Sequence, residues 1–303
     1  MKFPYYFAAL KIRYLWGKSD RKRDKGLSTP PGIVRFDNIQ YSDKAHDKKL
    51  NQLDVYRPHT GSSLKKLPVI VSIHGGGWIY GSKEVYQYYC MSLAEHGFAV
   101  VNYSYRLSPE SKFPASVEDT ENVFQWIQNN AVQYGFDTKN VFALGDSAGA
   151  HILSIYMSAL TNPEFAKNFP FIQKKSLKVR AVALNCGVYK VNCGIKINTD
   201  QVLLIKSLLK HGGTEEELDL IDTTAHLTKD FPPAFVMSCH GDFLLPQVPF
   251  IKEALDRAKI KNEYHCYGSI DNPLFHVFHC NIKLPEAKLC NDDECEFFRR
   301  HIK

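Results

Sequence analysis

Residues 145–149 have the sequence GDSAG, which fits the pattern G-x-S-x-G that can present a serine as a nucleophile. An apolar run at residues 141–144 precedes this stretch, and apolar side chains at helical spacing follow from Ala148. This order predicts a strand, a tight turn and a helix, with the Ser147 hydroxyl exposed at the turn. The pattern alone is weak, because small residues also occur in ordinary turns between a strand and a helix.

A glycine-rich stretch upstream supplies candidate donors for an oxyanion. The sequence HGGGW at residues 74–78 directly follows an apolar run at residues 67–73. Three consecutive glycines are costly in chain entropy, so they indicate backbone that approaches a ligand closely. We expect the N–H groups of Gly75 and Gly76, with that of Ala148, to form an oxyanion hole. Phosphate binding is disfavoured, because the lysine of a P-loop and the spacing of a dinucleotide fingerprint are missing.

An acid and a histidine downstream complete a candidate triad. A serine hydroxyl needs a base, and a histidine oriented by a carboxylate is the common one. Asp242 follows an apolar run at residues 234–239, and His276 comes after another at residues 263–267. The chain order Ser147, Asp242, His276 is the order found in α/β-hydrolases.

Each of these two assignments has an alternative. Asp242 could merely cap a following helix, and Asp271 is a second acid in the loop before His276. His279 lies three residues further on and is a second candidate base. The sequence has many histidines, but it lacks H-E-x-x-H or a similar ligand spacing, so we expect no metal.

The elements around these residues alternate between strands and helices from residue 67 onward. This alternation is typical of an α/β fold with a mostly parallel sheet and helices on both faces. Active sites in such sheets lie beyond the carboxyl ends of the strands. The expected strands are 34–41, 52–56, 67–73, 98–103, 141–144, 179–185, 234–239 and 263–267, and the expected helices are 86–96, 114–134, 148 onward, 248–258 and 285–302.

One segment precedes this alternation and another interrupts it. Residues 3–16 form an aromatic amphipathic segment, which we expect Gly17 to end before a charged connector at residues 18–25. We expect this segment to cover its own protein rather than a membrane surface. The second segment, residues 191–229, contains an expected helix at 201–210 and follows the carboxyl end of a strand, so it would lie above the site as a lid. A Thr214/Glu217 capping box opens a further short helix. A surface elaboration without function is the alternative for this insertion.

Composition restricts the class of protein. A chain of 303 residues fits one large domain, and its net charge of +6 comes largely from the first 25 residues, with no further support for nucleic-acid binding. The eight cysteines form no C-x-x-C pair, so we expect reduced thiols and a cytoplasmic location. The apolar N-terminus faintly imitates a signal peptide, but Lys11 and Arg13 interrupt it. No stretch is long enough to span a bilayer, and we expect no stable membrane insertion.

Taken together, the motifs resemble those of the hormone-sensitive-lipase-like carboxylesterases of the α/β-hydrolase fold. The resemblance covers residue 67 to the C-terminus. It implies an eight-stranded sheet, a serine acyl-enzyme mechanism without cofactor, and cap elements at residues 1–25 and 191–229 of a single domain, 1–303. The motifs that carry it, in the family's order, are HGGGW at 74–78, YRLSPE at 105–110, FPA at 113–115, GDSAG at 145–149, GD at 241–242 and HVF at 276–278.

Three departures from the family pattern bear on the substrate pocket. Phe243 stands where a second acid usually follows the catalytic aspartate, and Val277 replaces the usual glycine after the histidine. Ala150 and His151 replace a common Gly-Asn pair. These changes concern the shape of the acyl pocket more than the type of reaction.

The expected reaction is hydrolysis of a small ester, with Ser147 as nucleophile, His276 as base and Asp242 orienting the histidine. We expect aromatic side chains near the cap to enclose a short, acetyl-like acyl group. An amidase or peptidase, a non-catalytic ligand-binding member of the fold and an interfacial lipase are the alternatives, and a homodimer is left open. The aromatic residues expected at the pocket are Trp78, Tyr80, Tyr5, Tyr6 and Phe7.

Overall fold

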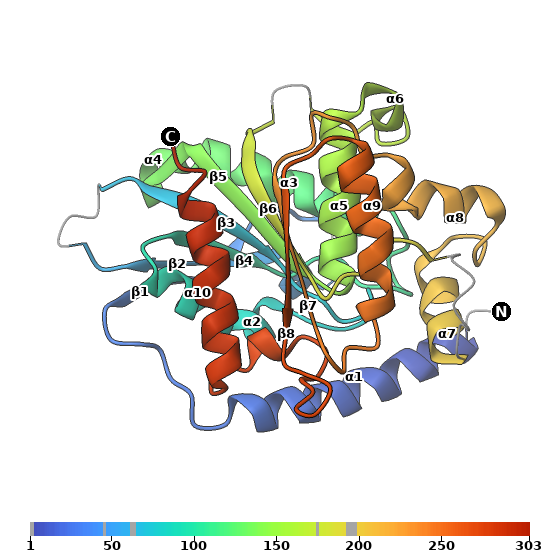
Figure 1. The fold of residues 1–303 in the computed structure, drawn as a ribbon, viewed down its shortest axis with the longest axis horizontal. Coiled ribbons are helices and arrows are strands. Elements are labelled where there is room, and N and C mark those ends of the chain that lie inside the picture. The colour runs from blue at the N-terminus through green and yellow to red at the C-terminus, as the bar shows by residue number, and fades with distance from the viewer. Residues whose placement is uncertain (1–2, 45–46, 61–64, 174–175, 192–198) are drawn as a thin grey trace.

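A computed structural model describes residues 3–44, 47–60, 65–173, 176–191 and 199–303. Eight strands form one sheet in the order β1-β2-β4-β3-β5-β6-β7-β8 (Figure 1). The pairs β1–β2 and β2–β4 are antiparallel, and all other neighbours are parallel, so the expected fold class is confirmed. The strands are β1 (Ile33–Gln40), β2 (Gln52–Pro58), β3 (Leu67–Ile73), β4 (Ala99–Tyr103), β5 (Phe136–Asp146), β6 (Val179–Asn185), β7 (Ala234–Cys239) and β8 (Asn262–Tyr267).

The register of the parallel strands brings their carboxyl ends to one edge. Ile73, the last residue of β3, pairs with Tyr103 of β4 and with Gly145 of β5. Asn185 at the end of β6 pairs in turn with Asp146. The glycine-rich stretch and the serine turn therefore leave the sheet side by side, as expected for an α/β site.

Helices cover both faces of the sheet and enclose two hydrophobic cores. Helices α2 (Lys83–Glu95) and α10 (Pro285–Arg299) pack on one face, whereas α3 (Ala115–Asn129), α5 (Ala148–Thr161) and α9 (Val248–Arg257) pack on the other. Every residue of α5 from Ala148 to Ala159 is buried, because its small and apolar side chains face neighbours on all sides. The short helices are α4 (Ala131–Tyr134), α6 (Pro163–Ala166) and α8 (Glu215–Ile221).

The helix expected at residues 114–134 is interrupted at Asn130. The Asn130 side chain donates a hydrogen bond to the carbonyl of Trp126 at 2.8 Å, and its backbone leaves the helical conformation. Asparagine competes for backbone groups in this way, which explains the break between α3 and α4. The strand expected at 141–144 is longer than predicted, since β5 begins at Phe136 and ends at Asp146. The polar first half of β5 also pairs with β3, starting at Leu67.

The N-terminal helix α1 (Phe3–Asp24) does not end at Gly17, so the expected charged connector is helical. Tertiary contacts on both sides of Gly17 hold the helix. Arg13 donates to the carbonyl of Ile79 at 2.6 Å, and Asp20 accepts from the Tyr80 hydroxyl at 2.6 Å. Such contacts outweigh the low helix propensity of one glycine. Figure 1 shows α1 along the lower edge of the molecule, below the sheet.

The insertion after β6 carries two helices, α7 (Thr199–Leu208) and α8. Helix α7 packs against α1 near its N-terminal end (Figure 1) and begins and ends two residues before the expected 201–210. The capping box at the start of α8 is confirmed, since the Thr214 hydroxyl accepts the Glu217 N–H and the Glu217 carboxylate accepts the Thr214 N–H. Residues 192–198 of the insertion lie outside the described residues.

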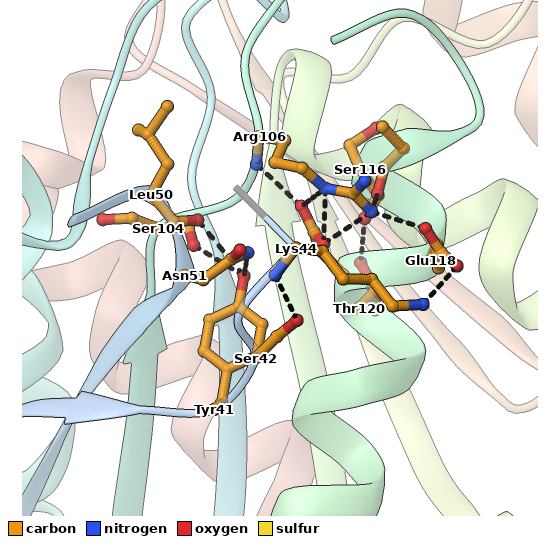
Figure 2. A network of polar contacts seen from close by, with 12 residues as sticks. Tyr41, Ser42, Lys44, Leu50, Asn51, Ser104, Arg106, Ser116, Glu118 and Thr120 are labelled. Atoms are coloured by element: carbon orange, nitrogen blue, oxygen red, sulfur yellow. Dashed lines mark hydrogen bonds and ion pairs between the residues drawn. The ribbon is translucent and has the colours of Figure 1, made fainter. Parts of the chain in front are cut away.

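A polar network fixes the segment that follows β4. The Arg106 guanidinium contacts both oxygens of Asp119 and donates to Glu118 at 2.6 Å (Figure 2). Asp119 also accepts the Arg106 N–H at 2.7 Å, and Lys44 pairs with Glu118. The Tyr41 hydroxyl donates to the Ser104 carbonyl at 2.7 Å. The arginine of the YRLSPE motif therefore joins β4 to the first turn of α3.

No helix in the described part of the chain is both long and apolar enough to cross a membrane. The seven cysteines that the structure describes are free thiols, and six of them are buried. Cys193 lies outside the described residues. The cytoplasmic location stays a prediction.

Candidate active site

Ser147 occupies a strained turn between β5 and α5. Its φ of 52° and ψ of −118° are rare for a residue with a side chain. Strand and helix pass so closely that a Cβ on Gly149 would lie 2.0 Å from the Ile73 carbonyl oxygen, and one on Gly145 would lie 2.5 Å from Gly149. The Ser147 N–H donates to the Asn185 carbonyl at 2.9 Å. Only glycines fit on either side of this serine, which explains the G-x-S-x-G spacing.

The structure brings together the three residues expected for the triad. The Ser147 Oγ lies 3.0 Å from the Nε2 of His276. The Nδ1 of His276 lies 2.8 Å from the Oδ1 of Asp242. Asp242 is on the loop after β7, and His276 is on the loop after β8. Both distances are hydrogen-bond distances, so a base contacts the serine and a carboxylate contacts the base.

The alternative acid and base lie elsewhere. Asp271 is exposed on the loop before His276. His279 is fully buried, its ring packs edge-on against Tyr89, and burial lowers its pKa to about 3. The helix-cap alternative for Asp242 is wrong, because Leu244 and Gln247 are the N-caps of the two helical segments that follow; the Asp242 Oδ1 instead accepts the Leu244 N–H at 2.8 Å within the turn. Asp242 therefore holds the turn after β7 and contacts the histidine with the same oxygen.

The second carboxylate oxygen of Asp242 also has donors. Its Oδ2 accepts a hydrogen bond from the Ser238 hydroxyl at 3.1 Å, and the Cys186 thiol lies against the same carboxylate. Burial alone would raise the pKa of Asp242, but the hydrogen bond and charge of His276, with the Leu244 N–H and the Cys186 thiol, lower it overall. Asp242 therefore remains ionised while buried.

The expected role of Gly75 needs correction. Its N–H donates to the Tyr86 hydroxyl at 3.0 Å, so this donor already has a partner. Within the described residues, no acceptor is found for the N–H groups of Gly76, Gly77 or Ala148, and all three residues line the cavity at Ser147. We did not predict Gly77 as a donor from the sequence, although its position as the third glycine of the HGGG stretch indicated this role.

A cavity of about 360 Å³ opens beside Ser147. Trp78 and Tyr80 line it, as expected. The expectation for Tyr5, Tyr6 and Phe7 was wrong, because these residues do not line the cavity, and Tyr6 and Phe7 are 42% and 64% exposed. Helix α1 instead contributes Trp16, Ser19, Asp20 and Arg23, and the last three of these lie beyond the expected end at Gly17.

Two of the departures from the family pattern lie at this cavity. The Phe243 ring contacts the His276 ring with 4.4 Å between centroids, and both line the cavity. Val277 adopts φ 54° and ψ 35°, a left-handed conformation that glycine takes without strain. A branched side chain there costs on the order of 1 kcal/mol or more, and it narrows the cavity beside the histidine.

Tyr86 links the glycine-rich stretch to the serine turn. Its hydroxyl accepts the Gly75 N–H at 3.0 Å and donates to the Asp146 Oδ2 at 2.7 Å. Tyr86→Phe leaves a buried donor and a buried acceptor without this partner, so we expect the free energy of unfolding to fall by about 1–3 kcal/mol. Urea unfolding measures the change. Tyr88→Phe on the same helix is the control, and equal losses in both variants would contradict this role.

Buried carboxylates lie beneath the serine turn. Glu294 of α10 accepts hydrogen bonds from the Asn185 side chain at 2.6 Å and from the Tyr89 hydroxyl at 3.3 Å. Asn185 is also the acceptor for the Ser147 N–H. Burial raises the pKa of Glu294 to about 7 and that of Asp146 to about 6. Glu294 therefore supports the serine turn through Asn185 at a cost in stability when it is ionised.

The cost of burying the ionised Glu294 carboxylate predicts that the free energy of unfolding depends on pH. The pKa of Glu294 lies above its ordinary value of 4.5, so the folded state binds more protons than the unfolded state between these values. The free energy of unfolding therefore falls as pH rises through this window. We expect Glu294→Gln to be more stable than the wild type at pH 8, by on the order of 1–3 kcal/mol, with a smaller difference at pH 5.

Urea unfolding at the two pH values tests this expectation. Glu296→Gln on the exposed side of the same helix is the matched control and should show no such pH dependence. A Glu294→Gln variant that is less stable than the wild type at both pH values would show that the carboxylate stabilises the fold.

Among the residues that the structure describes, two buried groups each bring three metal-ligating atoms within 4.8 Å of one another. One comprises Asp146, His279 and Cys280, and the other comprises Cys186, Cys239 and Asp242. Asp146 already accepts the Tyr86 hydroxyl, and Asp242 contacts His276. We assign no metal to either group, and the absence of a metal or cofactor stays a prediction.

The fold and motifs place the chain in a known family. The BD-FAE family model matches residues 53–250, which is more than half of the chain, so the chain belongs to this family. Esterase B of Lactobacillus rhamnosis has the same fold, with a TM-score of 0.86, 24% identity, and coverage of 97% of this chain and 96% of that one. The resemblance to the hormone-sensitive-lipase-like carboxylesterases of the α/β-hydrolase fold is confirmed.

Curated relatives carry esterase names. A probable carboxylic ester hydrolase, LipM of Mycobacterium tuberculosis, is 29% identical over 234 residues, which are 73% of this chain and 53% of LipM. A versiconal hemiacetal acetate esterase of Dothistroma septosporum is 26% identical over 239 residues, which are 74% of this chain and 70% of that protein. The matched part is thus little more than half the length of LipM.

Proposed function

We propose that this chain is a serine carboxylic ester hydrolase. The observation that carries the proposal is the continuous chain of contacts from Ser147 through His276 to Asp242, of which Ser147 and His276 line a cavity. The esterase names of its relatives support the same reaction class. None of the described departures from the family pattern replaces one of these three residues.

The geometry suits an acyl-enzyme mechanism. The Ser147 hydroxyl donates its proton to the Nε2 of His276 while its Oγ attacks the ester carbonyl carbon. His276 then returns the proton to the leaving alcohol, and the ester bond breaks to leave an acyl group on Ser147. Asp242 accepts the Nδ1–H of His276 and stabilises the imidazolium. Water, activated by the same histidine, attacks the acyl carbonyl and releases the acid and free Ser147.

The oxyanion forms against the backbone of two loops. The N–H groups of Gly76, Gly77 and Ala148 are the proposed donors, because they line the cavity and have no acceptor among the described residues. Each donor in such a hole is worth about a hundredfold to a thousandfold in rate. Gly75 contributes by fixing the loop through Tyr86 rather than by contacting the oxyanion.

Short acyl groups are the proposed substrates. The cavity of about 360 Å³ is small, and the bulky side chains of Trp78, Phe243 and Val277 are among those that line it. The acetate named for one relative is of this size. We propose that α1 and the insertion at 191–229 act as the cap, since Trp16 of α1 and Leu204 of α7 line the same cavity.

Turnover of p-nitrophenyl acetate, butyrate and octanoate tests this proposal, with p-nitroacetanilide as the amide. We expect kcat/KM to fall from butyrate to octanoate and amide turnover to be negligible. Octanoate as the best substrate would refute the short-chain assignment. Faster turnover of the amide than of the esters would instead indicate an amidase, and no turnover with any of the four would refute the proposed function.

A further inference from the structure

Helix α1 exposes an unusual concentration of large apolar side chains. Six of its residues between 6 and 16 are among the exposed large hydrophobic residues of the structure. Single exposed apolar side chains are common on protein surfaces, but a contiguous group indicates a surface that contacts something else. These residues are Tyr6, Phe7, Leu10, Tyr14, Leu15 and Trp16.

The exposed face of α1 changes from apolar to basic along the helix. Tyr6, Leu10 and Tyr14 follow one another at a spacing of four residues. Lys18 and Arg21 continue the same stripe, because spacings of three and four residues keep side chains on one face, and Lys25 follows in the turn directly after the helix. Residues 11 and 22 add two more exposed lysines beside it.

The acidic residues of α1 do not balance these cations. Asp20 accepts the Tyr80 hydroxyl and pairs with Arg23, and Asp24 pairs with the same arginine. In the part of the chain that the structure describes, the exposed cations have no acidic partner. Their positive charge is therefore presented to the surroundings. The cations are Lys11, Lys18, Arg21, Lys22 and Lys25.

This face lies beside the mouth of the cavity. Trp16, Ser19 and Asp20, on the neighbouring faces of the same helix, line the cavity. Phe243 also lines the cavity and is 62% exposed, and Phe275, which directly precedes His276 in the chain, is 80% exposed. An apolar surface in contact with α1 would therefore meet the entrance through which an ester reaches Ser147.

We propose that α1 docks this protein on an anionic lipid bilayer. Tyrosine and leucine side chains insert at the level of the headgroups, and the basic half of the stripe pairs with lipid phosphates, as in interfacial helices. A second copy of the chain fits less well, because the stripe offers no acidic residue to receive the lysines of a partner. The docking needs no catalysis, so it stands apart from the proposed function.

Sedimentation with vesicles tests the docking. The full chain carrying Ser147→Ala, which leaves lipids intact, is mixed with vesicles of phosphatidylcholine alone or of phosphatidylcholine with phosphatidylglycerol. We expect binding to the anionic vesicles only, and loss of this binding at high salt. Equal binding to both vesicle types, or no binding to either, would overturn the proposal.

Two double variants separate the two halves of the stripe. Leu10→Ser/Tyr14→Ser removes apolar area, and Lys18→Gln/Lys25→Gln removes charge, so we expect each to weaken binding at least about tenfold. Lys139→Gln/Lys261→Gln is the matched control, because these lysines lie at the opposite edge of the sheet, near the amino ends of β5 and β8. Equal loss in the control would show binding by overall charge alone and would contradict a role for α1.

Two further measurements keep the alternatives apart. Light scattering reports the mass of the chain without vesicles, and a dimer that Leu10→Ser/Tyr14→Ser dissociates would assign the stripe to a second copy and overturn the lipid proposal. Turnover of soluble p-nitrophenyl acetate by the same variants with Ser147 restored shows that they are folded. Vesicle binding without any ester turnover would refute the proposed function and leave the docking in place.

Discussion

Replacing Ser147 with alanine is expected to lower kcat for p-nitrophenyl acetate by at least ~10⁴-fold. The reason is that in the proposed mechanism its Oγ, which lies 3.0 Å from the Nε2 of His276, is the nucleophile. The rate at which the purified variant hydrolyses p-nitrophenyl acetate measures the loss of kcat. The free energy of unfolding, measured in urea, should remain close to that of the wild type, since the substitution removes only one hydroxyl.

Ser154→Ala provides the matched control for this variant. Ser154 lies two turns further along the same helix, and its buried hydroxyl donates to the Ala150 carbonyl at 2.7 Å. We expect this change to affect stability slightly and turnover little. Residual turnover in Ser147→Ala at the level of the control would mean that another group attacks the ester.

Asp242→Asn is expected to lower kcat by about 10³- to 10⁴-fold with little change in KM. The Asp242 Oδ1 lies 2.8 Å from the Nδ1 of His276 and fixes the tautomer in which Nε2 is free to accept the serine proton. An asparagine amide facing Nδ1 favours the opposite tautomer, and it removes the negative charge that stabilises the imidazolium. Steady-state kinetics with p-nitrophenyl butyrate separates kcat from KM.

Asp271→Asn is the control, because Asp271 is the other acid that the sequence offers in this region. It is exposed on the loop before His276, so we expect turnover within about twofold of the wild type. The reverse order of effects, with the larger loss in Asp271→Asn, would show that the loop rearranges when substrate binds.

The mostly parallel type of the sheet and the positions of its strands could be predicted from sequence because their signals are local. Residues 67–73, 179–185 and 234–239 are short, continuous apolar runs, and each forms a strand with the bounds expected. The errors fell where tertiary contacts outweigh local preference. Gly17 lies inside α1 because Arg13 and Asp20 hold the helix on both sides of it.

The proposed triad of Ser147, Asp242 and His276 could be predicted from sequence because each residue follows a strand. The carboxyl ends of parallel strands lie at one edge of the sheet. The residues that line the cavity were harder to predict from sequence, because they come from segments far apart in the chain. Ser19 and Arg23 line it because α1 continues past Gly17, whereas Tyr5 does not line it. The role of Gly75 also depends on a distant residue, since only the folded chain brings the Tyr86 hydroxyl to its N–H.

Covalent labelling with a p-nitrophenyl alkylphosphonate, read by intact mass and peptide mapping, tests the central claim most directly. The reagent phosphonylates an activated serine far faster than an ordinary hydroxyl, and its adduct mimics the tetrahedral intermediate in the oxyanion hole. We expect a single adduct on Ser147, which is absent in Ser147→Ala and forms far more slowly in His276→Ala. An unlabelled chain, or an adduct on another residue that persists in Ser147→Ala, would contradict the account.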